Sequence, residues 1–303
     1  MGDPEPLLSV VDLRYLYAAS PAVDGLSLSI HRGELFGLIG PDGAGKTTAI
    51  RTMAGVMKPQ GGSVRIGGRD PLDARSGVRE ILGYMPQRYS LYGDMSVAEN
   101  LRFFGTLFCL DPGTYRRRAD RLLSITRLGP FRDRRADALS GGMYKKLALA
   151  CSLLHEPELL LMDEPTNGVD PISRAELWDL LYEFVSAGMA VVVSTPYMDE
   201  AARCHSVGLL HHGRLLAEGR PSELVGGFAD SVWSVPVVSP EVDAVLEARE
   251  DAVIGVAPLG SGLRVVARGD GSGIVAALAA IGVDAKPAKP TFEDMFLSRV
   301  RAG

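Results

Sequence analysis

The apolar and polar positions of the chain predict short strands first and helices later. The runs LLSVVDL, GLSLSI and LFGLIG fall within the first 40 residues and are separated by turn signals such as HRGE, so each reads as a strand. Residues 88–158 carry mostly helical patterns, for example SVAENLRFFGTLF and GGMYKKLALACSLL. LLLMDEP, SRAELWDLLYEFVSAG and AVVVST then follow as a strand, a helix and a strand. This order predicts a parallel α/β domain with a helical insertion.

The pattern changes after the run VGLLHHGRLLAEGRPSELV. From about residue 229, the strand-like runs SVWSVPVV, AVIGVAPL and LRVVAR alternate with the helix candidates SPEVDAVLEARE and GIVAALAAIG. The β-α-β-β-α-β order suits a small split-βαβ domain, and TFEDMFLSRV adds a final helix. We therefore expect one domain over residues 1–226, with a helical subdomain at about 88–158, and a small α+β domain over 229–303.

Composition narrows the classes of function. The chain has 303 residues, 46% hydrophobic and 23% charged, as in ordinary globular proteins, and its net charge of −5 gives no whole-chain reason to expect a nucleic-acid partner. Cys109, Cys151 and Cys204 are widely spaced, which favours free thiols over a disulfide or a metal site. The start, MGDPEPLLSVVDL, does not resemble a signal peptide, and the apolar run GSGIVAALAAIGV is shorter than the roughly 18 residues of a membrane span.

A glycine-rich loop lies between a predicted strand and a predicted helix. Its sequence, GPDGAGKTT, matches G-x-x-x-x-G-K-[ST], and its glycines let successive N–H groups face one anion. We expect Lys46 to reach the β- and γ-phosphates of a nucleotide, Thr47 to bind Mg²⁺, and the helix N-terminus to add its partial charge. A plain turn with a surface lysine is the alternative, but it does not explain why Lys46 opens a helix. The predicted nucleotide-binding residues are Gly40, Pro41, Asp42, Gly43, Ala44, Gly45, Lys46, Thr47 and Thr48.

An acidic pair ends the later strand LLLMDEP. The strand delivers Asp163 and Glu164 at its C-terminal end, where ligands bind in open α/β sheets. Asp163 is expected to hold the Mg²⁺ shell through water, and Glu164 to polarise an attacking water. Such a pair alone is a weak signal, and the phosphate loop upstream of it makes it a strong one.

A second anion-binding turn is predicted at LSGGM, residues 139–143. Ser140, Gly141 and Gly142 would form a helix N-terminus that faces a phosphate. An ordinary N-cap serine with flexible glycines is the alternative. Two such turns in one chain, separated by a helical insertion, favour the phosphate-binding role.

Over roughly residues 7–225 these motifs resemble the ATPase subunits of ABC transporters. GPDGAGKTT stands for the phosphate loop, LLLMDEP for the Walker B strand, and LSGGM for the usual signature LSGGQ, with Met143 in place of glutamine. The resemblance implies the P-loop NTPase fold of an ABC ATPase domain, with a mixed sheet core and a helical subdomain, and it implies ATP and Mg²⁺ as cofactors. It also implies that Tyr17 stacks on adenine, instead of being an ordinary surface aromatic, and that Gln87 in GYMPQ acts in catalysis and touches Mg²⁺. Asp170 in NGVDP would face a second subunit.

A narrower resemblance points to the ATPases of ABC-2 type exporters, which include the daunorubicin-resistance type and the tandem-ATPase multidrug exporters. It is carried by LYGDMSVAENLRFFG, GVDPISR, STPYMDEA and the C-terminal motif PTFEDMFL. The resemblance implies an integral membrane permease as partner, whose coupling helix would meet residues Tyr89 to Gly105. It further implies a second ATPase domain joined head to tail and a cytoplasmic chain held at the inner face of the cell membrane, with no nucleic-acid partner.

The stretch VVVSTPYMDE departs from this family. ABC ATPases normally carry a histidine after the Ser-Thr of this strand, and that histidine contacts the γ-phosphate; here the residue is Pro196. Proline can neither donate a hydrogen bond nor ionise. Because losing one preorganised donor costs on the order of 10²–10³ in rate, we expect ATP binding to persist and hydrolysis to slow. Another residue that supplies the contact, or a shifted local register, would remove this expectation.

The preferred interpretation is the ATP-binding subunit of an ABC-2 type exporter, an ATPase. Two other functions stay open. A soluble ABC ATPase of translation or DNA maintenance would usually show tandem ATPase domains, long coiled coils or zinc-binding cysteines, and the sequence has none of these. A regulatory ATP-binding module is supported by Pro196 alone.

Overall fold

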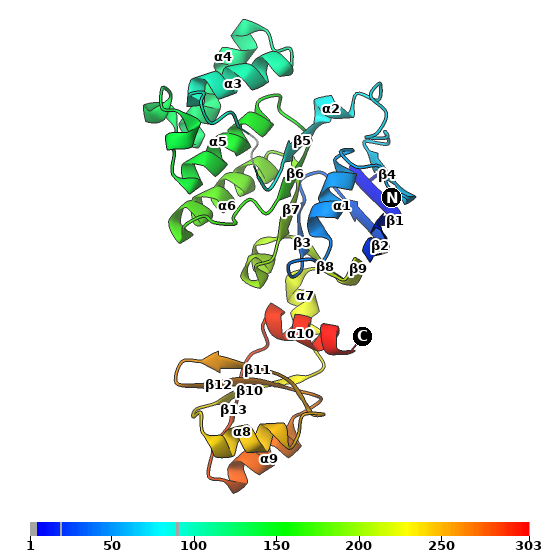
Figure 1. The fold of residues 1–303 in the computed structure, drawn as a ribbon, viewed down its shortest axis with the longest axis vertical. Coiled ribbons are helices and arrows are strands. Elements are labelled where there is room, and N and C mark those ends of the chain that lie inside the picture. The colour runs from blue at the N-terminus through cyan, green and yellow to red at the C-terminus, as the bar shows by residue number, and fades with distance from the viewer. Residues whose placement is uncertain (1–4, 19, 89–90, 303) are drawn as a thin grey trace. The chain divides into compact units, whose positions relative to one another are not determined.

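The structure is a computed structural model that describes residues 5–18, 20–88 and 91–302. It divides into two compact units between Leu215 and Leu216, a point that lies within strand β9 (Figure 1). The first unit holds the sheets and helices that build the phosphate loop, and the second unit is a small α+β fold.

A six-stranded sheet with a parallel centre forms the first unit's main layer. Its order is β5-β6-β7-β3-β8-β9, and the central strands pair in parallel. Every residue of β3, β6 and β7 is buried, because a parallel sheet covered on both faces needs continuous apolar strands. The strands are β3 (Leu35–Ile39), β5 (Leu82–Met85), β6 (Leu159–Asp163), β7 (Ala190–Thr195), β8 (Ser206–His211) and β9 (Arg214–Gly219).

A three-stranded antiparallel sheet, ordered β2-β1-β4, completes the mixed sheet system that the sequence predicts. Helix α1 lies between the two sheets (Figure 1). It shares one apolar cluster with both, in which Leu8, Ile50 and Leu161 are fully buried. This packing fixes the start of α1, and therefore the phosphate loop, against the parallel sheet. The elements are β1 (Leu8–Tyr17), β2 (Ser20–Ile30), β4 (Gly61–Ile66) and α1 (Lys46–Met53).

The helices beside the main sheet begin where the sequence supplies caps. Ser96 and Glu99 form a capping box at α3, and Asp111 and Asp170 cap α4 and α6, each followed by a proline that suits the first helical position. The fully buried Trp178 anchors α6. The elements are α2 (Val78–Ile81), α3 (Val97–Leu107), α4 (Pro112–Ile125), η1 (Gly129–Phe131), η2 (Ala136–Ala138), α5 (Gly141–Leu153), α6 (Pro171–Ser186) and η3 (Met198–Arg203).

The second unit has an antiparallel sheet ordered β11-β12-β10-β13. Two helices, α8 and α9, cover one face, where Val235, Val265 and Leu278 are fully buried in one core. The order of strands and helices along the chain is β-α-β-β-α-β. The elements are α7 (Pro221–Gly226), β10 (Ser231–Val235), α8 (Pro240–Glu247), β11 (Val253–Leu259), β12 (Gly262–Ala267), α9 (Ser272–Ala280), β13 (Lys286–Pro287) and α10 (Phe292–Ala302).

A buried ion pair ties the motif PTFEDMFL to this sheet. Arg264 on β12 donates from Nε to Asp294 Oδ1 at 2.9 Å, and the backbone N–H of Thr291 donates to Asp294 Oδ2 at 2.6 Å. Burial alone would raise the pKa of Asp294, but the hydrogen bonds from Arg264 and Thr291 outweigh it and the pKa is lowered. The motif is thus explained here by the attachment of α10 within the second unit.

Asp294→Asn is expected to lower the free energy of unfolding of the second unit by about 2 kcal/mol at neutral pH, since Arg264 loses its charged partner. Because the folded pKa is lowered, the carboxylate stabilises the fold above the ordinary carboxyl pKa of about 4 and loses this effect as the pH falls. Urea unfolding at pH 7 and in acid measures both effects. The exposed Asp284→Asn serves as the control, and equal losses in the two variants would contradict the assignment.

Candidate nucleotide site

The phosphate loop runs from the end of β3 to the start of α1 and depends on its glycines. Gly45 has φ +104°, and a Cβ there would lie 2.0 Å from the carbonyl oxygen of Ala22. A Cβ on Gly40 would lie 2.2 Å from the carbonyl oxygen of Leu210. Larger residues at these two positions would therefore displace backbone. Close packing against two neighbouring segments holds the loop in shape.

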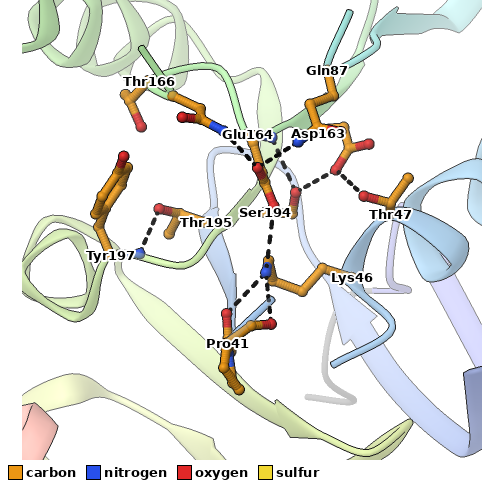
Figure 2. Close-up of polar contacts among 12 residues, drawn as sticks. Pro41, Lys46, Thr47, Gln87, Asp163, Glu164, Thr166, Ser194, Thr195 and Tyr197 are labelled. Atoms are coloured by element: carbon orange, nitrogen blue, oxygen red, sulfur yellow. Dashed lines mark hydrogen bonds and ion pairs between the residues drawn. The ribbon is translucent and has the colours of Figure 1, made fainter. Parts of the chain in front are cut away.

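Lys46 is the first residue of α1, and its side chain is only 3% exposed. Its Nζ donates to the carbonyl oxygens of Gly40 at 2.9 Å and Pro41 at 3.0 Å, and lies 3.4 Å from Glu164 Oε1 (Figure 2). A buried ammonium needs such partners. Its position between the loop and the acidic pair suits a cation that binds an anionic ligand there.

Asp163 ends β6 and is fully buried. Its Oδ1 accepts hydrogen bonds from Ser194 Oγ at 2.7 Å and Thr47 Oγ1 at 3.1 Å, whereas its buried Oδ2 has no hydrogen-bond partner among the described residues (Figure 2). Burial raises the pKa of Asp163, against the effect of those two bonds. A divalent cation would satisfy the orphaned oxygen and favour the charged form, so the residues fit Mg²⁺.

Glu164 has φ +48°, a strained backbone region for a residue with a side chain. Its Oε2 accepts hydrogen bonds from Gln87 Nε2 at 2.7 Å and Asn167 Nδ2 at 3.1 Å. Its backbone N–H donates to Ser194 Oγ at 3.1 Å. The carboxylate is therefore held by several partners, as a residue that orients a water must be.

These contacts bring together five residues that the sequence singles out from three separate segments: Lys46, Thr47, Gln87, Asp163 and Glu164 (Figure 2). Two further members, Ser194 and Asn167, are not among the predicted site residues. Two sequence features could have indicated them: Ser194 lies at the polar end of the strand AVVVST, and Asn167 lies in the turn that follows the acidic pair.

Other predicted residues lie outside this cluster. Ser140 caps α5, and its Oγ accepts a hydrogen bond from the backbone N–H of Met143 at 3.3 Å. Among the described residues, no hydrogen bond or ion pair joins Ser140, Gly141 or Gly142 to Lys46. Tyr17 is 49% exposed, with its hydroxyl 3.7 Å from Met57 Sδ. The contacts of Ser140 and Tyr17 are therefore separate from those of the cluster around Glu164.

Strand pairing places Pro196 beside the phosphate loop. Thr195 pairs with Ile39, and the N–H of Gly40 donates to the carbonyl oxygen of Thr195 at 3.3 Å. Pro196 follows directly, and the N–H of Tyr197 donates to Thr195 Oγ1 at 3.1 Å (Figure 2). The residue next to the loop at this strand end is thus one that cannot donate a hydrogen bond.

A buried carboxylate holds the segment after Pro196 in place. Glu200 is fully buried and accepts hydrogen bonds from Arg174 Nε at 2.5 Å, Trp178 Nε1 at 3.1 Å and Thr166 Oγ1 at 3.2 Å. Arg174 also lies over the ring of Tyr197, 4.3 Å from its centroid. These contacts connect η3 to α6 and to the turn after the acidic pair.

Comparison with known proteins gives one family. Residues 23–167 match the ABC transporter family. The chain is 46% identical over 224 residues to the probable multidrug ABC transporter ATP-binding protein YbhF of Escherichia coli, a match that covers 74% of this chain but 39% of YbhF. It is 36% identical over 242 residues to the daunorubicin/doxorubicin resistance ATP-binding protein DrrA of Streptomyces peucetius. This match covers 80% of this chain and 73% of DrrA. It is 33% identical to the daunorubicin resistance ATP-binding protein DrrA3 of Streptomyces coeruleorubidus, and this match covers 93% of this chain and 92% of DrrA3.

Solved structures agree with this result. An ATP-binding subunit of an ABC transporter superposes with a TM-score of 0.67 at 32% identity, covering 73% of this chain and 93% of that one. CbiO1 from Clostridium perfringens, part of the ABC transporter complex cbiONQ, also gives 0.67, at 30% identity and with coverage of 74% and 92%.

A glycine-rich loop between strand and helix, with an acidic pair at the end of a neighbouring parallel strand, defines a P-loop nucleotide-binding protein. The chain belongs to the ABC transporter family, as one of its ATP-binding proteins. The predicted fold class and family are confirmed. Members of this family hydrolyse ATP to power transport. Of the helices in the described ranges, none is long and apolar enough to cross a membrane.

Proposed function

We propose that the chain is the ATPase subunit of an ABC-2 type exporter and drives a separate integral membrane permease. Relatives named for multidrug transport and daunorubicin resistance support a role in export. The observation that carries the proposal is the cluster around Glu164, in which a buried carboxylate is held beside the phosphate-loop lysine and Gln87. A soluble ABC ATPase of translation or DNA maintenance is not favoured by these relatives.

In the proposed mechanism, Mg²⁺ neutralises phosphate charge when it is bound. Thr47, Asp163 and Gln87 would hold it, and Lys46 with the loop N–H groups binds and orients the nucleotide. Gln87 and Asn167 hold Glu164 in place. Glu164 accepts a hydrogen bond from the attacking water and orients that water toward the nucleotide. The exposed ring of Tyr17 would stack on adenine.

A second ATPase domain completes the proposed site. The turn of Ser140, Gly141 and Gly142 would bind ATP held by the other domain, which joins head to tail. Asp170 and the 75%-exposed Ile172 lie at the start of α6, on the segment assigned to that contact. The other domain belongs either to a chain that carries the γ-phosphate-contacting histidine (the switch histidine) at the position of Pro196, or to a second copy of this chain.

The permease would dock on the segment that begins at Tyr89 and ends at Gly105. Tyr89 lies outside the described residues, and the described part starts at Leu91. Here a groove of about 320 Å³ is lined by Met95, Glu99, Arg102, Phe103 and Thr106. The rings of Tyr92 and Phe103 contact edge to face at 4.6 Å beside it. Through this contact the chain would sit at the inner face of the cell membrane.

The test is co-purification from membranes, with identification of the bound integral membrane protein. Phe103→Asp is expected to reduce the recovered permease at least about tenfold, since it places a charge in an apolar contact. Leu107→Asp, on the same helix and 61% exposed, is the matched control and should retain the partner. Isolation of the wild-type chain without any integral membrane protein would contradict the proposal.

We also propose that residues from about 229 onward form a separable domain that serves assembly. These residues have their own core and belong to the compact unit that starts at Leu216, which supports this role. A chain that ends at Val225 is expected to bind ATP with unchanged affinity but to associate poorly with its partners. Nucleotide titration and co-purification measure the two effects; a folded, shortened chain that loses ATP binding would rule this division of roles out.

A further inference from the structure

Helix α5 contacts both Gln87 and Leu91. Lys145 Nζ donates to the main-chain carbonyl oxygen of Gln87 at 3.1 Å, and the N–H of Leu91 donates to the hydroxyl of Tyr144 at 3.3 Å. Tyr144 and Lys145 are adjacent residues at the start of α5, shortly after the cap residue Ser140. The positions of Gln87 and Leu91 therefore depend on the helix that begins at the Ser140 turn.

Gln87 also reaches the acidic pair. The side chain of Gln87 donates from Nε2 to Glu164 Oε2 at 2.7 Å (Figure 2). A continuous path thus runs from Lys145 through the main chain and side chain of Gln87 to Glu164. Among the described residues, the other side-chain partners of Glu164 are Lys46 and Asn167, and Pro196 has no group with which to orient the carboxylate.

We propose that Lys145 is a positioning residue for ATP hydrolysis, which keeps the amide of Gln87 against Glu164 by holding the main chain of Gln87. The inference rests on the proposed function, because it concerns the same hydrolytic site. The same contacts also link two parts of this chain that would serve different ATP molecules. Ser140, which would meet the other domain's ATP, and Glu164, which serves this domain's ATP, are joined through α5. A shift of α5 when the other domain's ATP binds at Ser140 would therefore move the Gln87 amide that holds Glu164.

The test is single-turnover hydrolysis of radiolabelled ATP with the full chain in excess, an assay that resolves slow rates. Lys145→Met is expected to lower the rate about tenfold through the loss of one charge-assisted hydrogen bond, while ATP affinity stays the same. Lys145→Arg retains a cationic donor and should recover most of the rate. In a Gln87→Ala background, Lys145→Met should cost nothing further, because Lys145 acts through the side chain of Gln87.

Lys146→Met is the matched control on the same helix. Lys146 pairs with Glu176 on α6 and not with Gln87. Lys146→Met should therefore lower the stability of the fold, and its effect should be the same with and without the side chain of Gln87. The proposal would be overturned if Lys145→Met lowered the hydrolysis rate by the same factor in the wild-type and the Gln87→Ala backgrounds. A rate that Lys145→Met leaves unchanged would also overturn it. If Lys145→Met does not fold, the Lys145→Arg rate decides: a loss equal to that of Gln87→Ala contradicts the proposal. Failure of the wild-type chain to bind ATP would instead refute the proposed function.

Discussion

Lys46→Ala is expected to abolish tight ATP binding, with an affinity loss of at least about 100-fold, whereas Glu164→Gln should bind ATP normally. Lys46 is a buried cation beside the loop that would hold the phosphates, and truncating one partner of a buried, hydrogen-bonded charge pair in a complex costs about 2–5 kcal/mol of binding free energy. The amide of Glu164→Gln has similar volume and keeps an acceptor for Gln87 and Asn167, but it is a weaker base. Its turnover should therefore fall about 10²-fold or more.

Equilibrium titration with ATP and a turnover assay measure these two effects separately. Lys286→Ala removes an exposed lysine of the second unit and should change neither. Equal nucleotide affinity in the wild type and Lys46→Ala would overturn the assignment of the phosphate loop.

The purified chain alone is expected to turn ATP over slowly, because Pro196 stands where the switch histidine is expected. The loss of one preorganised donor costs on the order of 10²–10³ in rate. ATP beside Lys46 would then stay bound longer, while a partner with its own histidine could hydrolyse ATP against the Ser140 turn of this chain. The pair would be asymmetric, with this chain as its slow half.

The measurement is ATP turnover before and after Pro196→His, at concentrations where the chain dimerises. Pro236→His, at an exposed position in the second unit, controls for the substitution itself. Fast turnover by the unmodified chain, unchanged by Pro196→His, would exclude the slow-half hypothesis. Full restoration by histidine is not required, since proline also fixes the local backbone.

The sequence predicted the parts of the fold that local pattern controls. The glycine-rich loop between a strand and a helix, the acidic pair at a strand end, and the order of strands and helices along the second unit each depend on residues close together in the chain, so motif and periodicity were sufficient. The family and fold class followed from those motifs and are confirmed.

Contacts between distant segments were not predictable in the same way. The orphaned Oδ2 of Asp163 and its bond to Ser194 depend on how two neighbouring strands are registered. The hydrogen bond from Lys145 to Gln87 joins residues 58 positions apart, and neither residue type reveals it. The division between the two units falls between Leu215 and Leu216, inside β9, because packing and not composition sets that boundary.

Under the proposed function, this chain binds and hydrolyses ATP to power a separate membrane exporter. The most direct measurement is ATP binding and turnover by the complex isolated from membranes through this chain, compared with the same complex carrying Lys46→Ala. We expect an integral membrane protein in the complex, ATP turnover by the unmodified complex, and loss of the ATP bound beside Lys46 in the variant. A complex without a membrane protein, a complex without ATP turnover, or ATP binding that Lys46→Ala leaves unaffected would contradict the proposal.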